Sequence, residues 1–157
     1  MWINHTVVSE LLRDERVAVA AYRALEDLGP DPLTSAQLRR IEHDHLEALN
    51  LIERQTLFLW EDPEEGGNVW RAWAPAIDAG AHHRAPDEAI ESLAEGERHG
   101  VEDLKRALMD ETLPFELQEL IANRLLPKAQ AHLGELERLR HRMALMMARS
   151  GFRGQRT

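Results

Sequence analysis

Carboxylate and imidazole side chains interrupt the apolar stripe of every long helical segment that this sequence predicts. In chain order they are Glu15, Glu42, His45, Glu97 and His132. A carboxylate that faces a core is costly unless it is paired or binds a metal ion, so one or two such residues in every segment call for a shared explanation. At a rise of about 1.5 Å per residue, their positions along the segments predict one layer near mid-height.

This set of side chains suits a transition-metal ion. Carboxylates and imidazoles without thiolate suit iron, with manganese and zinc as alternatives. Bundles that bind two iron ions take one Glu from each of two helices and Glu-x-x-His from each of the other two, because positions i and i+3 share a face. Glu15 and Glu97 fit the single carboxylates, and Glu42 with His45 forms one tetrad. In the tetrad that ends at His132, Ala129 replaces the glutamate.

Two further residues are candidates for supporting this layer from outside. Tyr22 lies two helical turns beyond Glu15 and fits either a core position or a hydrogen bond to a ligand carboxylate. Glu135 follows His132 by three residues and is a candidate substitute for the missing glutamate. The same residues also allow a metal-free alternative, in which a buried network of Glu, His and Tyr holds the helices in register.

Composition narrows the class of protein. The chain has 157 residues, 43% hydrophobic and 30% charged, which predicts one globular domain. The absence of cysteine excludes disulfides, thiolate metal sites and cysteine nucleophiles. With 28 acidic against 19 basic residues, the net charge of −9 argues against nucleic-acid binding. No apolar run reaches the roughly 20 residues of a membrane span and no signal peptide is evident, so we expect a cytoplasmic protein.

The C-terminal end carries the opposite charge. Residues 138–157 contain six arginines and no acidic residue. We divide the chain into a bundle domain over residues 1–149 and a basic tail over 150–157. This charge suits the negative end of a helix dipole, and contact with RNA, a membrane surface or a partner protein is the alternative.

The elements that must position these residues are helices. Strand-type alternation is scarce, and apolar residues recur at helical spacing over four segments, near residues 3–28, 34–60, 86–108 and 114–148. Pro127 predicts a kink or short break in the last segment. Short links make the first pair and the last pair antiparallel.

Residues 61–85 form the one long connection. A structureless loop of this length is uncommon in a compact domain. We therefore expect a crossover along the bundle, with a short helix over 68–77 whose Trp70 and Trp73 pack on the bundle surface. The predicted fold is all-α, a four-helix bundle with one long crossover between helices two and three, which is the ferritin-like arrangement.

The stretch from Glu15 to Tyr22 resembles the E-x-x-A-x-x-x-Y motif of rubrerythrin-type ferritin-like proteins. More closely, the chain resembles a family of uncharacterised bacterial ferritin-like four-helix bundles over about residues 5–140. The stretches that carry this resemblance are Val69–Trp73, Glu95–Gly100, and Leu125–Pro127 followed by His132. The resemblance implies the fold and a metal site more than it implies a reaction.

Three hypotheses for function follow. The first is a ferritin-like metalloprotein with one or two iron ions that oxidises Fe(II) with dioxygen or peroxide in iron handling or stress protection. The second is a metal-free structural or interaction bundle that acts through its surface. The third is a hydrolase with paired carboxylates, for which the sequence offers no phosphate loop or nucleophile motif. A homodimer is the expected oligomeric state.

Overall fold

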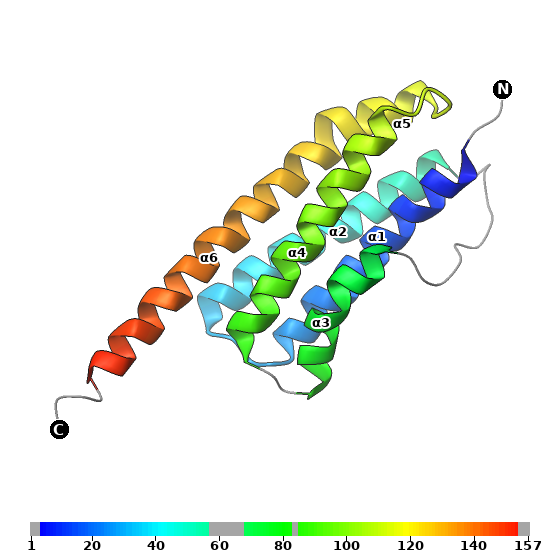
Figure 1. The fold of residues 1–157 in the computed structure, drawn as a ribbon. Coiled ribbons are helices and arrows are strands. Elements are labelled where there is room, and N and C mark those ends of the chain that lie inside the picture. The colour runs from blue at the N-terminus through cyan, green and yellow to red at the C-terminus, as the bar shows by residue number, and fades with distance from the viewer. Residues whose placement is uncertain (1–3, 57–67, 83–84, 154–157) are drawn as a thin grey trace.

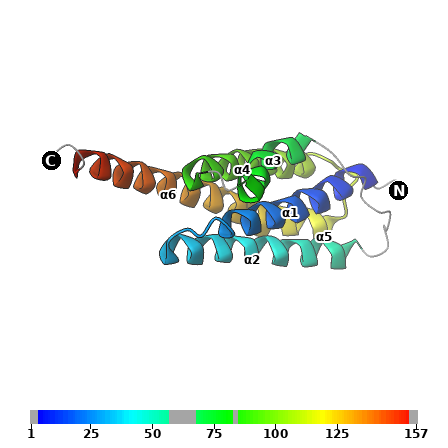
Figure 2. The same ribbon diagram turned by 90° about the horizontal axis from the view of Figure 1, so that it is seen from below.

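The computed structural model describes residues 4–56, 68–82 and 85–153, and within them the chain is all-α, with no strand. Figures 1 and 2 show an elongated molecule of long helices lying side by side. The elements are α1 (His5–Glu26), α2 (Pro32–Gln55), α3 (Asn68–His82), α4 (Pro86–Leu108), α5 (Phe115–Leu120), the π-helix η2 (Ile121–Leu125) and α6 (Leu126–Arg153).

Local sequence explains where the helices begin and end. Asp31 caps α2, because its carboxylate accepts hydrogen bonds from the amide of Thr34 at 3.0 Å and from the Thr34 hydroxyl at 2.6 Å. The helix therefore begins at Pro32, two residues before the predicted start. Between α1 and α2, Gly29 adopts a φ of +67°, a conformation that ends a helix and favours glycine.

The helices are arranged so that four of them surround one interior. α1 packs against α2, α3 and α4, and α4 also packs against α3 and α6. In Figure 1, α2 and α4 run in one direction while α1 and α6 run in the other. The predicted crossover between α2 and α4 falls partly outside the described residues, at 57–67 and 83–84.

The described part of the crossover, α3, is longer and more deeply packed than predicted. It extends to His82, and Trp73 is only 2% exposed instead of lying on the bundle surface. Gly96 of α4 makes this possible, because a Cβ atom at that position would lie 2.2 Å from Cδ2 of Trp73. The side chain of Trp70 lies outside the described residues.

The expected break near Pro127 is a π-helical turn. The amide of Leu126 donates to the carbonyl of Ile121, five residues earlier, and the α-helix then continues as α6. Proline cannot donate a backbone hydrogen bond and its ring crowds the preceding turn, so the extra residue of a π turn accommodates it without ending the helix.

A polar layer divides the apolar core into two clusters. One cluster contains Leu25, Leu38, Ile90 and Leu136, and the other contains Leu11, Ile52, Val101 and Leu125, among others. On each of the four long helices, the polar residue lies in sequence between members of the two clusters. The predicted layer of polar groups near mid-height is therefore present.

The C-terminal part of α6 projects beyond the other helices, as Figures 1 and 2 show. Residues 144–151 are exposed, and the helix continues past its predicted end near Ala148 to Arg153. Over the part of the chain that is described, none of the helices combines the length and apolar character needed to cross a bilayer.

Candidate metal centre

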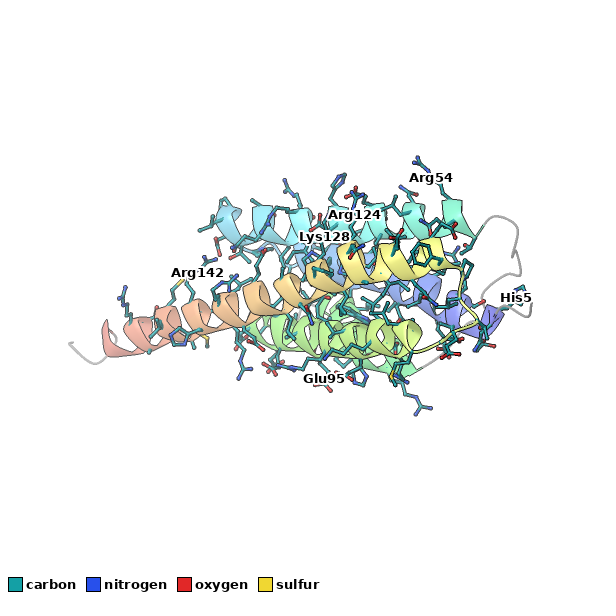
Figure 3. The ribbon with its side chains drawn as sticks, turned by 90° about the horizontal axis from the view of Figure 1, so that it is seen from above. His5, Arg54, Glu95, Arg124, Lys128 and Arg142 are labelled. Atoms are coloured by element: carbon teal, nitrogen blue, oxygen red, sulfur yellow. The ribbon has the colours of Figure 1, made fainter. Side chains whose placement is uncertain are left out.

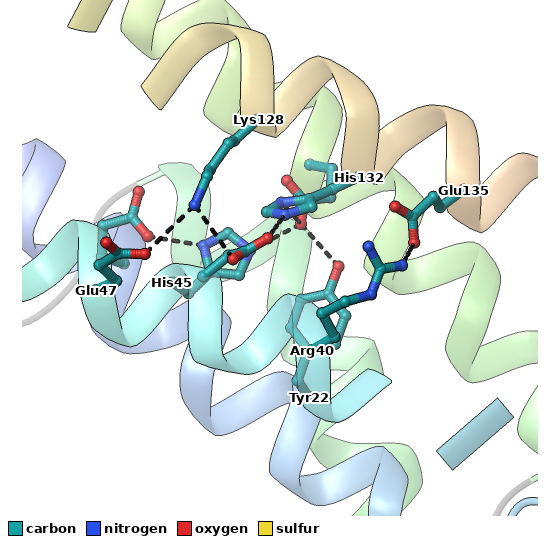
Figure 4. Close-up of polar contacts among 10 residues, drawn as sticks. Tyr22, Arg40, His45, Glu47, Lys128, His132 and Glu135 are labelled. Carbon is teal, nitrogen blue, oxygen red and sulfur yellow. Dashed lines mark hydrogen bonds and ion pairs between the residues drawn. The ribbon is translucent and has the colours of Figure 1, made fainter. Parts of the chain in front are cut away.

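Four helices each contribute one side chain to the polar layer. Glu15 comes from α1, His45 from α2, Glu97 from α4 and His132 from α6. His45, Glu97 and His132 are buried, with exposed fractions of 7%, 1% and 4%. Figure 4 shows His45 and His132 approaching each other inside the molecule, together with the hydroxyl of Tyr22.

Glu97 lies at the centre of the layer. Its Oε1 atom is 2.8 Å from Nε2 of His45 and 3.6 Å from Nδ1 of His132. The hydroxyl of Tyr22 donates a hydrogen bond to the same oxygen at 2.7 Å. One carboxylate oxygen therefore gathers contacts from three different helices.

In each histidine, the ring nitrogen on the side away from Glu97 contacts another carboxylate. Nδ1 of His45 lies 2.7 Å from Oε2 of Glu15, and Nε2 of His132 lies 2.8 Å from Oδ2 of Asp44. In both rings the other nitrogen faces Glu97. A carboxylate on the rear nitrogen orients an imidazole and makes its front nitrogen a better metal ligand.

The three front atoms have the spacing of a metal site. One ligand atom each from His45, Glu97 and His132 lies within 4.8 Å of the others. Ligands about 2.1 Å from a common ion lie about 3 to 3.5 Å apart, close to the 2.8 and 3.6 Å found here. Within the described part of the chain, Nδ1 of His132 is also buried without a hydrogen-bond partner, as expected for an atom that binds an ion.

The donor set restricts the identity of the ion. Two imidazoles and one carboxylate with open positions are typical of non-haem Fe(II) centres, and the same set occurs in catalytic zinc sites. Magnesium and calcium prefer all-oxygen ligands, so nitrogen from two histidines disfavours them.

When no metal ion is bound, a proton on His45 balances the negative charge of the carboxylates around it. Burial alone lowers the pKa of His45, but the carboxylates of Glu97 and Glu15 outweigh it and hold this pKa well above its usual value. Burial raises the pKa of Glu97, yet the neighbouring His45 and His132 and the Tyr22 hydroxyl lower it overall. A protonated His45 between two carboxylates thus takes the place of a cation.

Asp44 connects this centre to the surface. Although burial raises its pKa, the hydrogen bond with His132 and the nearby Lys128 ammonium bring it below its usual range. Nζ of Lys128 lies 3.3 Å from carboxylate oxygens of both Asp44 and Glu47. Figure 3 shows Lys128 and Arg124 on the side of the molecule where α2 and the helix of residues 121–153 face each other.

Two predicted residues are not brought into this group. Glu42 forms an ion pair with Arg23 of α1, with 2.6 Å between its Oε1 and Nε of the arginine. Glu135 pairs with Arg40 of α2, as Figure 4 also shows. Glu15 contacts the rear of His45 and is absent from the three-residue cluster.

Sequence reasoning missed two acidic residues. Asp44 stands between the two histidines of the Glu42–His45 tetrad, and Asp14 follows Leu11 by three residues on the apolar stripe of α1. Asp14 is 7% exposed, and its Oδ2 atom is buried with no hydrogen-bond partner in the residues that the structure describes. Burial, followed by contact with Asp103, raises the pKa of Asp14 to about 10.

A small cavity adjoins the centre. Its volume is about 20 Å³, and it is bordered by Asp14, Glu15, His45 and Glu97 together with apolar side chains. A site of this size is sufficient for about one water molecule, which needs roughly 10 to 15 Å³.

Comparisons with protein-family models, with curated proteins and with solved structures find no match for this chain.

Proposed function

We propose that this protein is a ferritin-like four-helix bundle that binds a divalent transition-metal ion, iron first, with manganese and zinc as alternatives. The ligand atoms are Nε2 of His45, a carboxylate oxygen of Glu97 and Nδ1 of His132. Glu15 and Asp44 orient the two histidines. The parallel course of α2 and α4 supports the ferritin-like assignment, because it is the arrangement that a long crossover produces.

One observation carries the metal assignment. Two independent carboxylate–histidine pairs, on different helices, each direct one ring nitrogen to the same oxygen of Glu97. Hydrogen bonding alone accounts for His45, which bridges two carboxylates. It does not account for the Nδ1 atom of His132, which is buried and has no hydrogen-bond partner among the described residues.

A direct test is metal uptake by the chelator-treated protein. After anaerobic incubation with Fe(II), Mn(II) or Zn(II), we expect about one tightly bound ion per chain and a higher melting temperature. An ion present at a hundred times its Kd stabilises the folded state by about 2.7 kcal/mol. His132→Ala should abolish uptake, while His141→Ala, an exposed histidine on the same helix, should leave it unchanged.

The second candidate is a metal-free bundle held in register by the polar layer. The hydrogen bonds from Tyr22 and His45 to Glu97 support it, since they form without any ion. It predicts a melting temperature that responds neither to chelator nor to added metal. Equal and negligible uptake by the native protein and by His132→Ala would favour this candidate over the metalloprotein.

The reaction we propose is oxidation of Fe(II) to Fe(III), in which two Fe(II) ions give one electron each to the oxidant. With two protons, hydrogen peroxide is then reduced to two water molecules, or dioxygen to hydrogen peroxide. Anaerobic Fe(II)-loaded protein, mixed with either oxidant, should form Fe(III) faster than free Fe(II) at the same pH. The rate for His132→Ala should equal the rate without protein. A rate for the native protein equal to this background rate would contradict the proposed oxidation but not the proposed metal binding.

A further inference from the structure

Large apolar side chains are exposed in two groups at opposite ends of the molecule. Within the described part of the chain, six such residues are at least half exposed, and five of them belong to these groups. Met109 and Phe115 flank the turn between α4 and α5, and they are 82% and 67% exposed. Leu145, Met146 and Met147 lie where α6 projects beyond the other helices. Clustered apolar groups mark contact surfaces, whereas single ones are ordinary.

The projecting part of α6, residues 144–151, extends the apolar stripe of its helix past the core. Leu139 is buried, Met143 packs against the core cluster at the next turn, and Met146 one turn further on is exposed. Eight helical residues span about 12 Å. This α6 end therefore presents an apolar stripe that the helices of its own chain do not cover, as Figure 2 shows.

The α6 end is also basic. From Ala144 to the C-terminus the sequence contains three arginines and no acidic residue, and Arg149 is exposed among the apolar side chains. The rest of the chain is acidic, since residues 1–137 contain 13 basic and 28 acidic residues. Charge alone therefore favours an acidic partner for this end.

The other exposed group, the α4–α5 end of residues 109–120, carries the opposite charge. It contains four acidic residues and no basic one. Three of these acids are exposed, namely Glu111, Glu116 and Glu119. Nε2 of Gln118 donates to the carbonyls of Asp110 and Leu113 at 3.1 and 3.2 Å, which fixes the turn. This end is thus a preformed surface, with apolar groups and an acidic rim.

We propose that the α6 end of one copy of this chain binds the α4–α5 end of a second copy, so that copies associate head to tail. The two surfaces cannot meet within one chain. Phe115 and Met146 lie on the continuous run of α5, η2 and α6, 31 residues and about 45 Å apart, and Figure 1 shows them on opposite sides of the molecule.

This contact differs from the closed homodimer expected from sequence. It joins two different surfaces, so every dimer keeps one free surface of each kind and adds further copies. In the contact, the apolar side chains of the two ends cover each other and the arginines face the acidic rim. The inference is independent of the proposed metal site and survives or fails without it.

An anionic membrane is the other partner that suits an apolar, basic helix end. Segments that bind anionic lipids carry about four to eight Lys or Arg residues, whereas the α6 end has three. A complementary acidic surface, in contrast, is present on the chain itself. Binding of the protein to phosphatidylserine vesicles, with no association of the protein in solution, would assign the α6 end to membranes and overturn the proposal.

Analytical ultracentrifugation at increasing protein concentration gives the first test. Contacts of this size are of the weak class, so the series extends to about 1 mM. We expect the average mass to rise beyond that of a dimer. A native protein that stays monomeric throughout, or stops at a dimer, would overturn the proposal.

Variants of each surface identify the contact. The double variant Met146→Glu and Met147→Glu should be monomeric, because glutamates at the α6 end repel the acidic rim. The double variant Met109→Gln and Phe115→Gln should also be monomeric, because it removes the apolar groups of the α4–α5 end. All four side chains are exposed, and circular dichroism checks that the folds persist. Leu33→Gln, the sixth exposed apolar residue, is the matched control and should associate as the native protein does.

A mixture of the two double variants gives the decisive comparison. The α6 variant keeps an intact α4–α5 end, and the α4–α5 variant keeps an intact α6 end. An equimolar mixture should therefore form a dimer and nothing larger. A symmetric contact between two α6 ends predicts no dimer of the two variants and undiminished association of the α4–α5 variant alone. Either result would overturn the head-to-tail contact.

Discussion

Nε2 of His132 donates a hydrogen bond to Oδ2 of Asp44 across 2.8 Å, and this contact turns the opposite ring nitrogen towards Glu97. Asp44 thus fixes which nitrogen of His132 can bind an ion. The carboxylate lies one residue before His45 on α2, so a single helix both supplies one proposed ligand and orients the other histidine.

Asp44→Asn should therefore weaken metal binding without removing a ligand. Loss of a carboxylate behind a metal-binding histidine lowers affinity by about ten- to a hundredfold. Competition with a chelating dye would measure the change for Zn(II) or Mn(II). Glu47→Gln is the matched control, because Glu47 contacts Lys128 at the same 3.3 Å distance as Asp44 but is not bonded to His132. Equal losses in both variants would argue against an orienting role.

His45 makes metal binding compete with a proton. Both ring nitrogens face carboxylate oxygens, at 2.7 and 2.8 Å, and these carboxylates hold the pKa of His45 well above its usual value, so Nε2 carries a proton that it must lose before it can bind an ion. We expect each bound ion to release about one proton at pH 7 and the affinity to rise with pH. Calorimetric titrations in two buffers of different ionisation enthalpy would count the protons. Binding that releases no proton would exclude His45 as a ligand.

The same proton stabilises the metal-free protein. Because the pKa of His45 is raised on folding, this stabilisation is fully present below the unfolded value of 6.5 and is lost as the pH rises through the folded value. In chelator, the native protein should therefore lose stability with rising pH more steeply than His45→Gln. Denaturant titrations of both proteins at several pH values would show the difference in slope.

The polar layer could be predicted from sequence because it follows from the helical spacing of polar and apolar residues. Helical spacing alone places Glu15, His45, Glu97 and His132 on inward faces at similar heights, and the structure brings all four together. Spacing also placed Glu42 on the inner face. It could not show that the carboxylate turns to Arg23, because that choice depends on a rotamer and on a neighbour in another helix.

The residues that sequence reasoning missed depend on helix packing. Asp44 reaches His132 because of how α2 and α6 face each other, which no spacing within α2 reveals. Trp73 is buried because Gly96 lets α3 approach α4 closely, so a tryptophan expected on the surface enters the core. Pro127, by contrast, has a local effect on its own helix, and the break it predicts is present as the π turn.

Tyr22 is the only tyrosine, so its ionisation can be followed without ambiguity. Burial and the adjacent Glu97 carboxylate raise its pKa well above 10. We expect no phenolate absorbance from the folded protein at pH values where free tyrosine ionises, and a sudden increase on unfolding. Gradual ionisation in the folded state would place the hydroxyl in water.

Tyr22→Phe should destabilise the metal-free protein by about 1 to 3 kcal/mol, because the buried carboxylate of Glu97 loses a hydrogen-bond donor. Denaturant unfolding measures this loss. Metal binding should offset part of it, since the ion itself then interacts with Glu97. A variant as stable as the native protein in chelator would show that the hydrogen bond contributes little.

Two glycines of α4 should respond in opposite ways to alanine. In Gly96→Ala the new methyl group would meet the Trp73 ring at 2.2 Å, so we expect a loss of about 1 to 3 kcal/mol from overpacking. In Gly100→Ala the methyl group has no neighbour within 4 Å, and the better helix propensity should add up to about 1 kcal/mol. Thermal unfolding of the two variants tests whether Trp73 packs against Gly96. Equal changes in stability would contradict this packing.

Asp14 should make the metal-free protein less stable as the pH rises. Its pKa is about 10 in the folded protein and 3.8 as a model value, chiefly because burial disfavours the charged form. A raised pKa means that this stabilisation is complete below 3.8 and declines up to about 10, by at most about 1.4 kcal/mol per pH unit. Asp14→Asn carries no ionisable group there, so its stability relative to the native protein should increase across this range. Glu10 is an exposed carboxylate on the same helix, so the stability of Glu10→Gln should change with pH as that of the native protein does. The same pH dependence of stability in all three proteins would mean that Asp14 is ionised and hydrated in the folded state.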